Sequence, residues 1–236
     1  MSALLSVRNI EAFYGASQVL HGIDFDIARG EQVALIGRNG MGKTTLLRTL
    51  MGLVPNTRGS LNFHGRDLLR AAPETIALAG MALVPEGRGV FGSLSVTENL
   101  VMAARRGSGG QLNWTLPRIF ELFPRLHQRR NNGGHQLSGG EQQMLTIGRA
   151  LMTNPDLILI DEATEGLAPL VAQDIWKTLG VIRGEGIATI VVDKDFRSLA
   201  KIADRTLLLS KGRVVFDGAP SALTAQPDLL ERHLGV

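Results

Sequence analysis

The chain has 236 residues, of which 44% are hydrophobic and 20% charged, a balance that supports one sizeable globular core. Its net charge of +3 is too small to argue for nucleic-acid binding. The absence of cysteine excludes disulfides and cysteine-ligated metals. No apolar run approaches the about 20 residues that a membrane-spanning helix needs, and residues 1–9 lack the pattern of a secretory signal. We therefore expect neither a spanning helix nor a signal peptide.

Strand and helix patterns alternate in the first part of the chain. The alternation of apolar and polar residues from Ile23 to Ile27 predicts a half-buried strand. Residues 32–36 form a short apolar run that predicts a buried strand, and a helical pattern follows over residues 42–51. Another strand is expected over residues 81–84.

The middle of the chain is mostly helical in pattern. Ser95 and Glu98 have the spacing of a capping box and predict a helix over residues 95–105. Further helices are expected over residues 116–122 and 139–152, and the second of these has an apolar face.

Alternation returns near the end. The predicted elements are a strand over 157–160, a helix over 171–182, a strand over 188–192, a hairpin of residues 206–209 with 214–216, and a helix over 227–234. This order predicts one α/β domain over residues 1–236. Its nucleotide-binding core comprises 1–87 and 156–236, and a helical lobe is inserted at 88–155.

A glycine-rich loop between a predicted strand and a predicted helix carries the first chemical motif. Residues 37–44 fit the phosphate-loop pattern G-x-x-x-x-G-K-[ST]. In this pattern the main-chain amides point at phosphate oxygens. In this pattern Lys43 reaches the β- and γ-phosphates, Thr44 ligates Mg²⁺ and Thr45 touches the α-phosphate. The predicted ATP-binding residues of this loop are Gly37, Arg38, Asn39, Gly40, Gly42, Lys43, Thr44 and Thr45.

Two carboxylates follow the apolar strand at 157–160. A strand that lies beside the loop-bearing strand would place Asp161 near Mg²⁺ and Glu162 beside the attacking water, where Glu162 would act as catalytic base. An Asp-Glu pair at a strand end is common, so this assignment depends on the phosphate loop upstream.

A second glycine-rich helix start occurs at Leu137-Ser138-Gly139-Gly140-Glu141. Ser138 and the two glycine amides form another anion cradle, which one nucleotide on one chain does not need. Two chains arranged head-to-tail do need it, because each cradle then closes on the γ-phosphate that its partner holds.

With these three motifs in this order, the sequence resembles the ATP-binding subunits of ABC transporters over its whole length. The resemblance implies a phosphate-loop core with a mostly parallel sheet, an antiparallel β subdomain and an inserted helical lobe. It also implies that two subunits sandwich two ATP molecules, with Ser138, Gly139, Gly140 and Glu141 acting on the partner's ATP. By that likeness Tyr14 stacks on adenine, although it also fits an ordinary strand residue.

Two further segments resemble the ATPases of the branched-chain amino acid importer group, which also includes urea and amide importers. These are Val84-Pro85-Glu86-Gly87-Arg88 and the run Glu165-Gly166-Leu167-Ala168-Pro169. The resemblance implies ATP hydrolysis at the cytoplasmic face of the inner membrane. Its implied partners are a second ATPase subunit, separate permeases and, indirectly, a periplasmic binding protein. Glu86 stands where the family has glutamine, and it binds Mg²⁺ through water by this likeness.

Two departures from the family pattern concern the catalytic step. Lys194 stands at the position of the usual γ-phosphate histidine, and Ala168 replaces a frequent aspartate. Lysine pairs with phosphate but cannot accept a hydrogen bond. We therefore expect slow hydrolysis by the isolated chain and a better-equipped paralogue as partner.

Two other functions remain open on the sequence alone. One is a soluble ABC ATPase in translation or DNA repair, which a single cassette without heptads disfavours. The other is a weakly hydrolysing regulator, which Lys194 favours and Glu162 disfavours. Phe91, Leu94 and Val96 fit either a permease-docking surface or the core.

Overall fold

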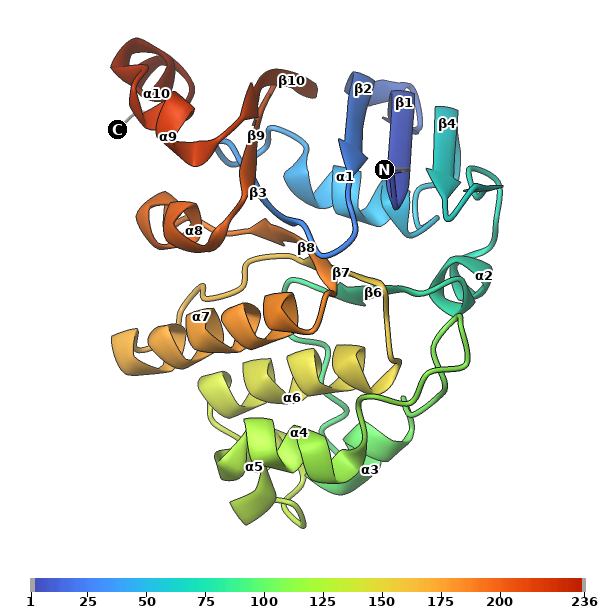
Figure 1. Ribbon diagram of the computed structural model, residues 1–236, viewed down its shortest axis with the longest axis vertical. Coiled ribbons are helices and arrows are strands. Elements are labelled where there is room, and N and C mark those ends of the chain that lie inside the picture. The colour runs from blue at the N-terminus through green and yellow to red at the C-terminus, as the bar shows by residue number, and fades with distance from the viewer. Residues whose placement is uncertain (1–2, 235–236) are drawn as a thin grey trace.

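The computed structural model describes residues 3–234, which form two sheets and the helices around them (Figure 1). The larger sheet has six strands in the order β10-β9-β3-β8-β7-β6. Its strands are β3 (Gln32–Ile36), β6 (Met81–Val84), β7 (Leu157–Ile160), β8 (Ala188–Val192), β9 (Arg205–Ser210) and β10 (Arg213–Gly218). Only β10 is antiparallel to its neighbour, so the expected mostly parallel sheet is confirmed.

The central strand β3 is buried on both faces, which explains its uninterrupted apolar sequence. Val33 and Leu35 pack in one core cluster with α1 (Lys43–Leu50) and the smaller sheet. Ala34 and Ile36 pack in a second cluster with α6 (Gly139–Met152) and α7 (Pro169–Gly184). The six-stranded sheet therefore separates α1 from α6 and α7, as Figure 1 shows.

The smaller sheet is antiparallel and has the order β2-β1-β4-β5. Its strands are β1 (Leu5–Tyr14), β2 (Ser17–Ile27), β4 (Asn56–Phe63) and β5 (Arg66–Asp67). The alternation predicted for residues 23–27 belongs to the longer strand β2. A register shift between Val7 and Ile10, with Asn9 at φ 46°, interrupts the alternation of β1. The antiparallel β subdomain is confirmed.

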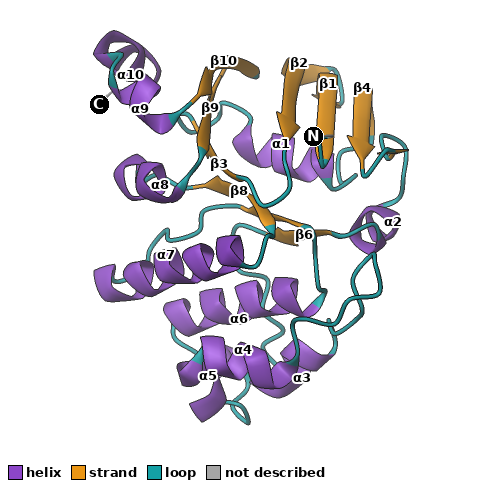
Figure 2. Ribbon diagram, viewed as in Figure 1, coloured by secondary structure: helices purple, strands orange, loops and turns teal. Residues whose placement is uncertain are grey.

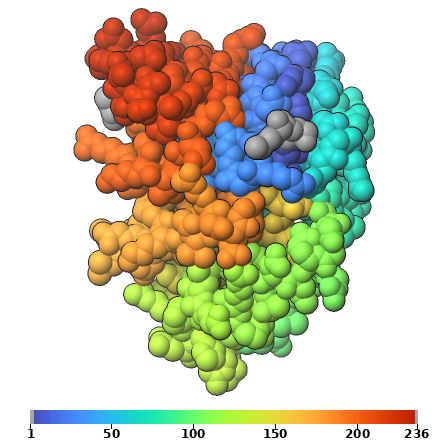
Figure 3. All heavy atoms as spheres, in the orientation of Figure 1, coloured from blue at the N-terminus to red at the C-terminus, as the bar shows by residue number. Residues whose placement is uncertain are grey.

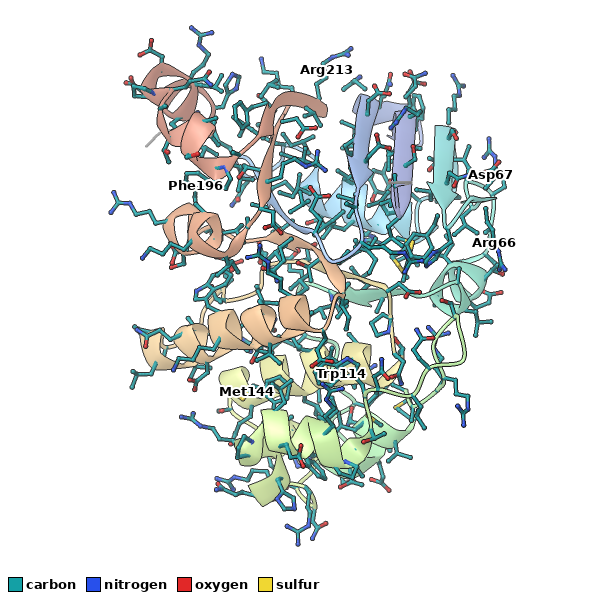
Figure 4. All side chains as sticks on the ribbon, viewed as in Figure 1. Arg66, Asp67, Trp114, Met144, Phe196 and Arg213 are labelled. Atoms are coloured by element: carbon teal, nitrogen blue, oxygen red, sulfur yellow. The ribbon has the colours of Figure 1, made fainter. Side chains whose placement is uncertain are left out.

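The helices of the middle segment lie together beyond α6 (Figure 2). They are α3 (Val96–Val101), α4 (Leu116–Leu122), α5 (Pro124–Gln128) and the short 3₁₀ helix η1 (Gly134–Gln136). The buried side chains of Trp114 and Met144 belong to the core cluster that joins these helices to α6, and Figure 4 shows both in this half of the molecule. The remaining helices are α2 (Pro73–Leu78), α8 (Phe196–Ile202), α9 (Pro220–Thr224) and α10 (Pro227–Leu234).

The helix expected over residues 95–105 is shorter in the structure. The predicted capping box at Ser95 is present, but α3 ends at Val101. The amides of Ala103 and Ala104 bond three residues back, and the amide of Arg105 donates to Met152 O at the end of α6. The chain thus leaves the helix after Val101 and joins the end of α6 at Arg105.

The space-filling view in Figure 3 shows the middle segment gathered at one end of the molecule and the C-terminal segment at the other. Within residues 3–234, no helix is both long and apolar enough to cross a bilayer.

Candidate active site

The phosphate loop joins β3 to α1, and two of its glycines are required by the backbone. A Cβ on Gly37 would overlap the carbonyl oxygen of Leu209 on the neighbouring strand β9. Gly42 has φ 102° and precedes α1 without any side-chain cap. The first amides of α1 therefore remain available for an anion.

Lys43 lies across this loop. Its ammonium Nζ donates to the main-chain oxygens of Gly37 at 2.7 Å and Arg38 at 3.0 Å. Burial lowers the pKa of Lys43, while the carboxylates of Asp161 and Glu162 oppose that shift. The ammonium thus lies on the loop, within the electrostatic influence of the two carboxylates.

Asp161 ends the fully buried strand β7, and its carboxylate is itself buried. Burial raises the pKa of Asp161, against the effects of the Thr44 hydroxyl and the Lys43 ammonium. In the described part of the chain its Oδ1 has no hydrogen-bond partner. Asp161, Thr44 and Glu86 line one pocket of about 420 Å³. An unpartnered carboxylate oxygen beside a hydroxyl and a second carboxylate fits a hard divalent cation.

The donor set is small for a metal held by protein alone. Within residues 3–234 no three His, Cys, Asp or Glu side chains converge on a metal position. Mg²⁺ in nucleotide enzymes is bound by one or two carboxylates together with substrate phosphates and water. The pocket at Asp161 therefore fits Mg²⁺ that arrives with a nucleotide.

Glu162 is held in an unusual backbone conformation, with φ 55°. Its neighbour Glu165 hydrogen-bonds to it, and this bond, burial and the charges of Glu165 and Glu86 raise the pKa of Glu162 to about 7. Lys194 partly opposes the shift. A carboxylate with a pKa near neutrality is suited to accepting a proton from water.

Lys194 follows β8, and its ammonium forms an ion pair with Glu165. This bond raises the pKa of Lys194. The hydrogen bond with Glu162, followed by the bond with Lys194, lowers the pKa of Glu165, and the side chains of Lys194 and Glu165 are both exposed. Lys194 therefore lies at the same edge of the sheet as Glu162. Its charge lowers the pKa of Glu162 directly, and its ammonium is paired with Glu165.

One functional residue of this edge escaped the sequence prediction. Asp193 is buried, and its Oδ2 accepts hydrogen bonds from Thr164 N at 2.7 Å and Thr164 Oγ1 at 2.8 Å. It thereby fixes the segment that carries Glu162 and Glu165. The signal was the run Asp193-Lys194-Asp195 directly after an apolar strand, the same pattern that identified Asp161.

The segment predicted to form a second anion cradle lies at the start of α6. The hydroxyl of Ser138 accepts from Glu141 N at 3.3 Å, and the amide of Ser138 donates to Glu141 Oε2 at 2.8 Å. The carboxylate of Glu141 therefore caps its own helix. Among the described residues, the amides of Gly139 and Gly140 donate to no protein acceptor.

The segment that carries Glu86 is bound to the same helix. Thr146 Oγ1 donates to Arg88 O at 2.6 Å, and Arg149 Nη1 donates to Gly89 O at 2.6 Å. The guanidinium of Arg149 also lies 4.7 Å from the centre of the Phe91 ring. Phe91 is exposed and Leu94 partly so, whereas Val96 is fully buried in the core. Val96 therefore belongs to the core, whereas Phe91 and Leu94 remain candidates for a docking surface.

Tyr14 lies at the end of β1 with 44% of its surface exposed. Tyr14 lies at the turn of the β1–β2 hairpin. Strand β2 of this hairpin packs on the phosphate loop, since a Cβ on Gly42 would lie 3.0 Å from Leu20 Cδ2 and 3.5 Å from Val19 Cγ1. An exposed aromatic ring on this hairpin is available for stacking.

The structure therefore brings the phosphate loop, Asp161, Glu162, Glu86 and Lys194 to the carboxyl ends of neighbouring parallel strands. It does not bring Ser138 and Gly139 to this edge of the sheet. α1 continues the phosphate loop on one face of the six-stranded sheet, whereas α6 packs on the opposite face.

This fold and this site define a nucleotide-hydrolysing ATPase of the phosphate-loop class. Residues 20–165 match the family model described as ABC transporter. The chain belongs to the ABC transporter family, whose ATP-binding proteins hydrolyse ATP.

Curated relatives cover almost the whole chain. It is 40% identical to the high-affinity branched-chain amino acid transport ATP-binding protein BraG of Pseudomonas aeruginosa, over 98% of this chain and 100% of BraG. It is 28% identical to the lipopolysaccharide export system ATP-binding protein LptB of Escherichia coli K12, over 99% and 98% of the two chains.

Solved structures give the same fold. An ATP-binding subunit of an ABC transporter aligns with a TM-score of 0.83 at 29% identity, over 98% of this chain and 96% of the other. A nucleotide-free ATP-binding cassette from an ABC transporter aligns with a TM-score of 0.85 at 23% identity, over 98% of each chain. The expected ABC ATPase fold is confirmed.

Proposed function

We propose that this chain hydrolyses ATP with Mg²⁺ to drive uptake of branched-chain or related amino acids through separate permease chains. The observation that carries the proposal is the convergence of Lys43, Asp161 and Glu162 at one edge of the sheet. The solute follows from the 40% identity to BraG, which exceeds the 28% identity to the exporter-type relative LptB. The direction of transport follows from the same comparison.

Each residue has a separate role in this proposal. The amides of the phosphate loop and the ammonium of Lys43 bind the phosphates, and Tyr14 stacks on the base. Thr44 and Asp161 hold Mg²⁺ directly and Glu86 holds it through water. Bound Mg²⁺ neutralises charge on the phosphates. Glu162 orients the attacking water and accepts its proton.

The proposed assembly follows from the two layers of the chain. Because α1 and α6 lie on opposite faces of the sheet, Ser138 and Gly139 would act on ATP held by a second ATPase subunit. That subunit is a second copy or a paralogue arranged head-to-tail. Residues 88–155 would form the lobe that carries the cradle, and 1–87 with 156–236 the core; residues 1–2 and 235–236 lie outside the described part.

Permease chains would hold the pair at the cytoplasmic face of the inner membrane, with a periplasmic binding protein as an indirect partner. Large apolar side chains are exposed on α2, on α3 and around the segment after Glu86, a distribution that fits a protein partner. These residues are Leu78, Phe91, Val101 and Met102.

The first test is Mg²⁺-dependent ATP hydrolysis by the purified chain and its Glu162→Gln variant. We expect the variant to bind ATP normally and to hydrolyse it at least about 100-fold more slowly, because it has lost its base. Equal rates would contradict the role of Glu162. If the wild type turns over slowly, a gain with Lys194→His would assign the slow rate to Lys194, whereas no gain would assign it to a missing partner.

The solute needs a separate assay. Uptake of labelled leucine, urea and a short amide by vesicles that contain the cognate permeases would be compared with uptake by vesicles that contain Glu162→Gln. ATP-dependent uptake of leucine is the expected result. Co-purification with ribosomes or DNA instead of permeases would contradict the transport function.

A further inference from the structure

Arg88 lies two residues after Glu86, yet its position is set by the signature helix α6. The main-chain oxygen of Arg88 accepts the hydroxyl of Thr146 at 2.6 Å. The next carbonyl, that of Gly89, accepts from Arg149 Nη1 at 2.6 Å. With φ 67°, Arg88 also has a left-handed backbone that an L-residue adopts rarely. These two hydrogen bonds and the left-handed backbone together fix the position of the Arg88 Cβ.

The guanidinium of Arg88 lies directly against Gly139. A Cβ built on Gly139 would be 2.9 Å from Nη1 and 3.1 Å from Nη2 of Arg88. A side chain at position 139 would displace the guanidinium. The glycine therefore allows a cation to lie against the start of α6, beside the Gly139 and Gly140 amides that have no protein acceptor.

The charges around this helix start leave Arg88 without a counter-ion. Among the described residues, no carboxylate lies within ion-pair distance of its guanidinium, and the guanidinium donates no hydrogen bond to protein. Glu141, the nearest acid in the motif, is bonded to Ser138 and lies 3.8 Å from Arg129 Nε. A half-buried guanidinium with several free donors is suited to bidentate contact with phosphate oxygens.

We infer that Arg88 binds the terminal phosphate of the ATP held by a second copy of this chain, together with Ser138 and the amides of Gly139 and Gly140. The inference rests on the proposed head-to-tail assembly. Glu141 places a negative charge in the cradle where the phosphate would approach, and Arg129 offsets it. Arg88 then supplies the remaining positive charge that draws the anion in.

The test measures ATP-dependent pairing, not turnover. In the Glu162→Gln chain with ATP and Mg²⁺, sedimentation gives the dissociation constant of the dimer. Affinity of the monomer for ATP is measured separately at protein concentrations below that constant. Arg88→Met keeps the apolar stem and removes the charge, so it is the principal variant.

We expect Arg88→Met to raise the dimer dissociation constant by about 10-fold or more, because each closed site loses a charge-assisted contact. The affinity of the monomer for ATP should stay within about 2-fold of the parent, a smaller change than the loss of one charge-assisted contact would cause. Arg88→Lys should restore part of the loss. Arg66→Ala is the control, since Arg66 lies exposed on β5 at the far edge of Figure 4 and should change neither quantity.

Three outcomes would overturn the inference. Unaltered pairing by Arg88→Met would leave Arg88 only a packing role. A parallel loss of monomer affinity would place its contact on the nucleotide of its own chain. Absence of any ATP-dependent dimer in the parent would exclude the two-copy arrangement, while the hydrolysis assay still decides the ATPase function independently.

Mixing two variants separates action across the dimer from action within one chain. In the Glu162→Gln background, a Lys43→Ala chain lacks a working phosphate loop but retains Arg88, and an Arg88→Met chain has the opposite defect. Their mixed dimer contains one complete site only if Arg88 acts on the partner's nucleotide. We expect the mixture to dimerise with ATP more tightly than either variant alone, and a mixture no tighter than its components would overturn the inference.

Discussion

Glu162 is constrained by its backbone and by three charged neighbours. Glu165 and Glu86 raise its pKa, and Lys194 opposes them. In the nucleotide-free chain the base is therefore partly protonated at neutral pH. Its activity depends on a balance of charges that single substitutions can shift in either direction.

We predict that Glu165→Gln moves the acidic limb of the kcat/KM profile to lower pH. The limb falls where Glu162 becomes protonated, near its raised pKa of about 7. The hydrogen bond with Glu165 is the largest cause of that shift. The glutamine amide can donate to the ionised carboxylate of Glu162 and carries no charge, so Glu162 stays ionised at lower pH. The measurement is ATP hydrolysis from pH 5.5 to 8.5, a range of about 1.5 units on either side of that pKa.

Lys194→Met is the matched variant with the opposite sign. Lys194 lowers the pKa of Glu162, so its loss should move the limb to higher pH. Movement of both variants in the same direction would contradict the assignment of the limb to Glu162.

The sequence predicted the catalytic role of Glu162 but not the contacts that set its pKa. Asp161 and Glu162 follow an apolar strand, so their position at a sheet edge was readable. The ion pair of Lys194 with Glu165 joins residues 29 apart, and it depends on how the loops after β7 and β8 fold back. The contact of Arg88 with Gly139 was hidden for the same reason.

At the scale of elements, Asn154 joins the end of α6 to the middle segment. It is buried, and its φ of 51° lies in the left-handed region that asparagine tolerates. Its Oδ1 accepts from Trp114 N at 2.7 Å, and its Nδ2 donates to Arg105 O at 2.9 Å and Trp114 O at 3.1 Å. One side chain thus serves main-chain groups of two separate segments.

We predict that Asn154→Ala lowers the free energy of unfolding by about 2–4 kcal/mol, because several buried main-chain groups lose their partner. Denaturant unfolding followed by circular dichroism measures the change. Asn154→Gly is the control for the backbone conformation, since glycine adopts this φ freely. Full stability in Asn154→Gly would show that the hydrogen bonds contribute little.

The elements that the sequence predicted well are those with uniform patterns. β3, β7 and β8 are fully buried and read as apolar runs, and α6 has a long apolar face. β1 was not predicted because a register shift at Asn9 breaks its alternation. α2 and α8 have only 6 and 7 residues, too few for a helical period to emerge.

At the scale of the whole molecule, the phosphate loop sits between the two sheets that share one core cluster. Leu46, Leu47 and Leu50 of α1 pack in that cluster with residues of β1, β2 and β4 as well as β3. A nucleotide bound to the loop and the start of α1 should therefore stabilise both sheets, since α1 packs against each of them.

We predict that ADP with Mg²⁺ at 100 times its dissociation constant adds about 2.7 kcal/mol to the free energy of unfolding. For a domain of this size that corresponds to a rise in Tm of about 5–10 °C, measured by scanning calorimetry. Lys43→Ala should lose most of the rise because it loses the phosphate contact. A full rise in Lys43→Ala would place the nucleotide elsewhere.

The segment from Glu86 to Gly89 contributes to two sites at once. Glu86 lines the pocket of Asp161, and Arg88 lies against Gly139, while hydrogen bonds from α6 hold the carbonyls of Arg88 and Gly89. In a head-to-tail pair, a shift of this segment caused by one nucleotide would alter the contact made to the other. Thermodynamic linkage requires any such coupling to be mutual, so each bound nucleotide would change the affinity for the other by the same factor.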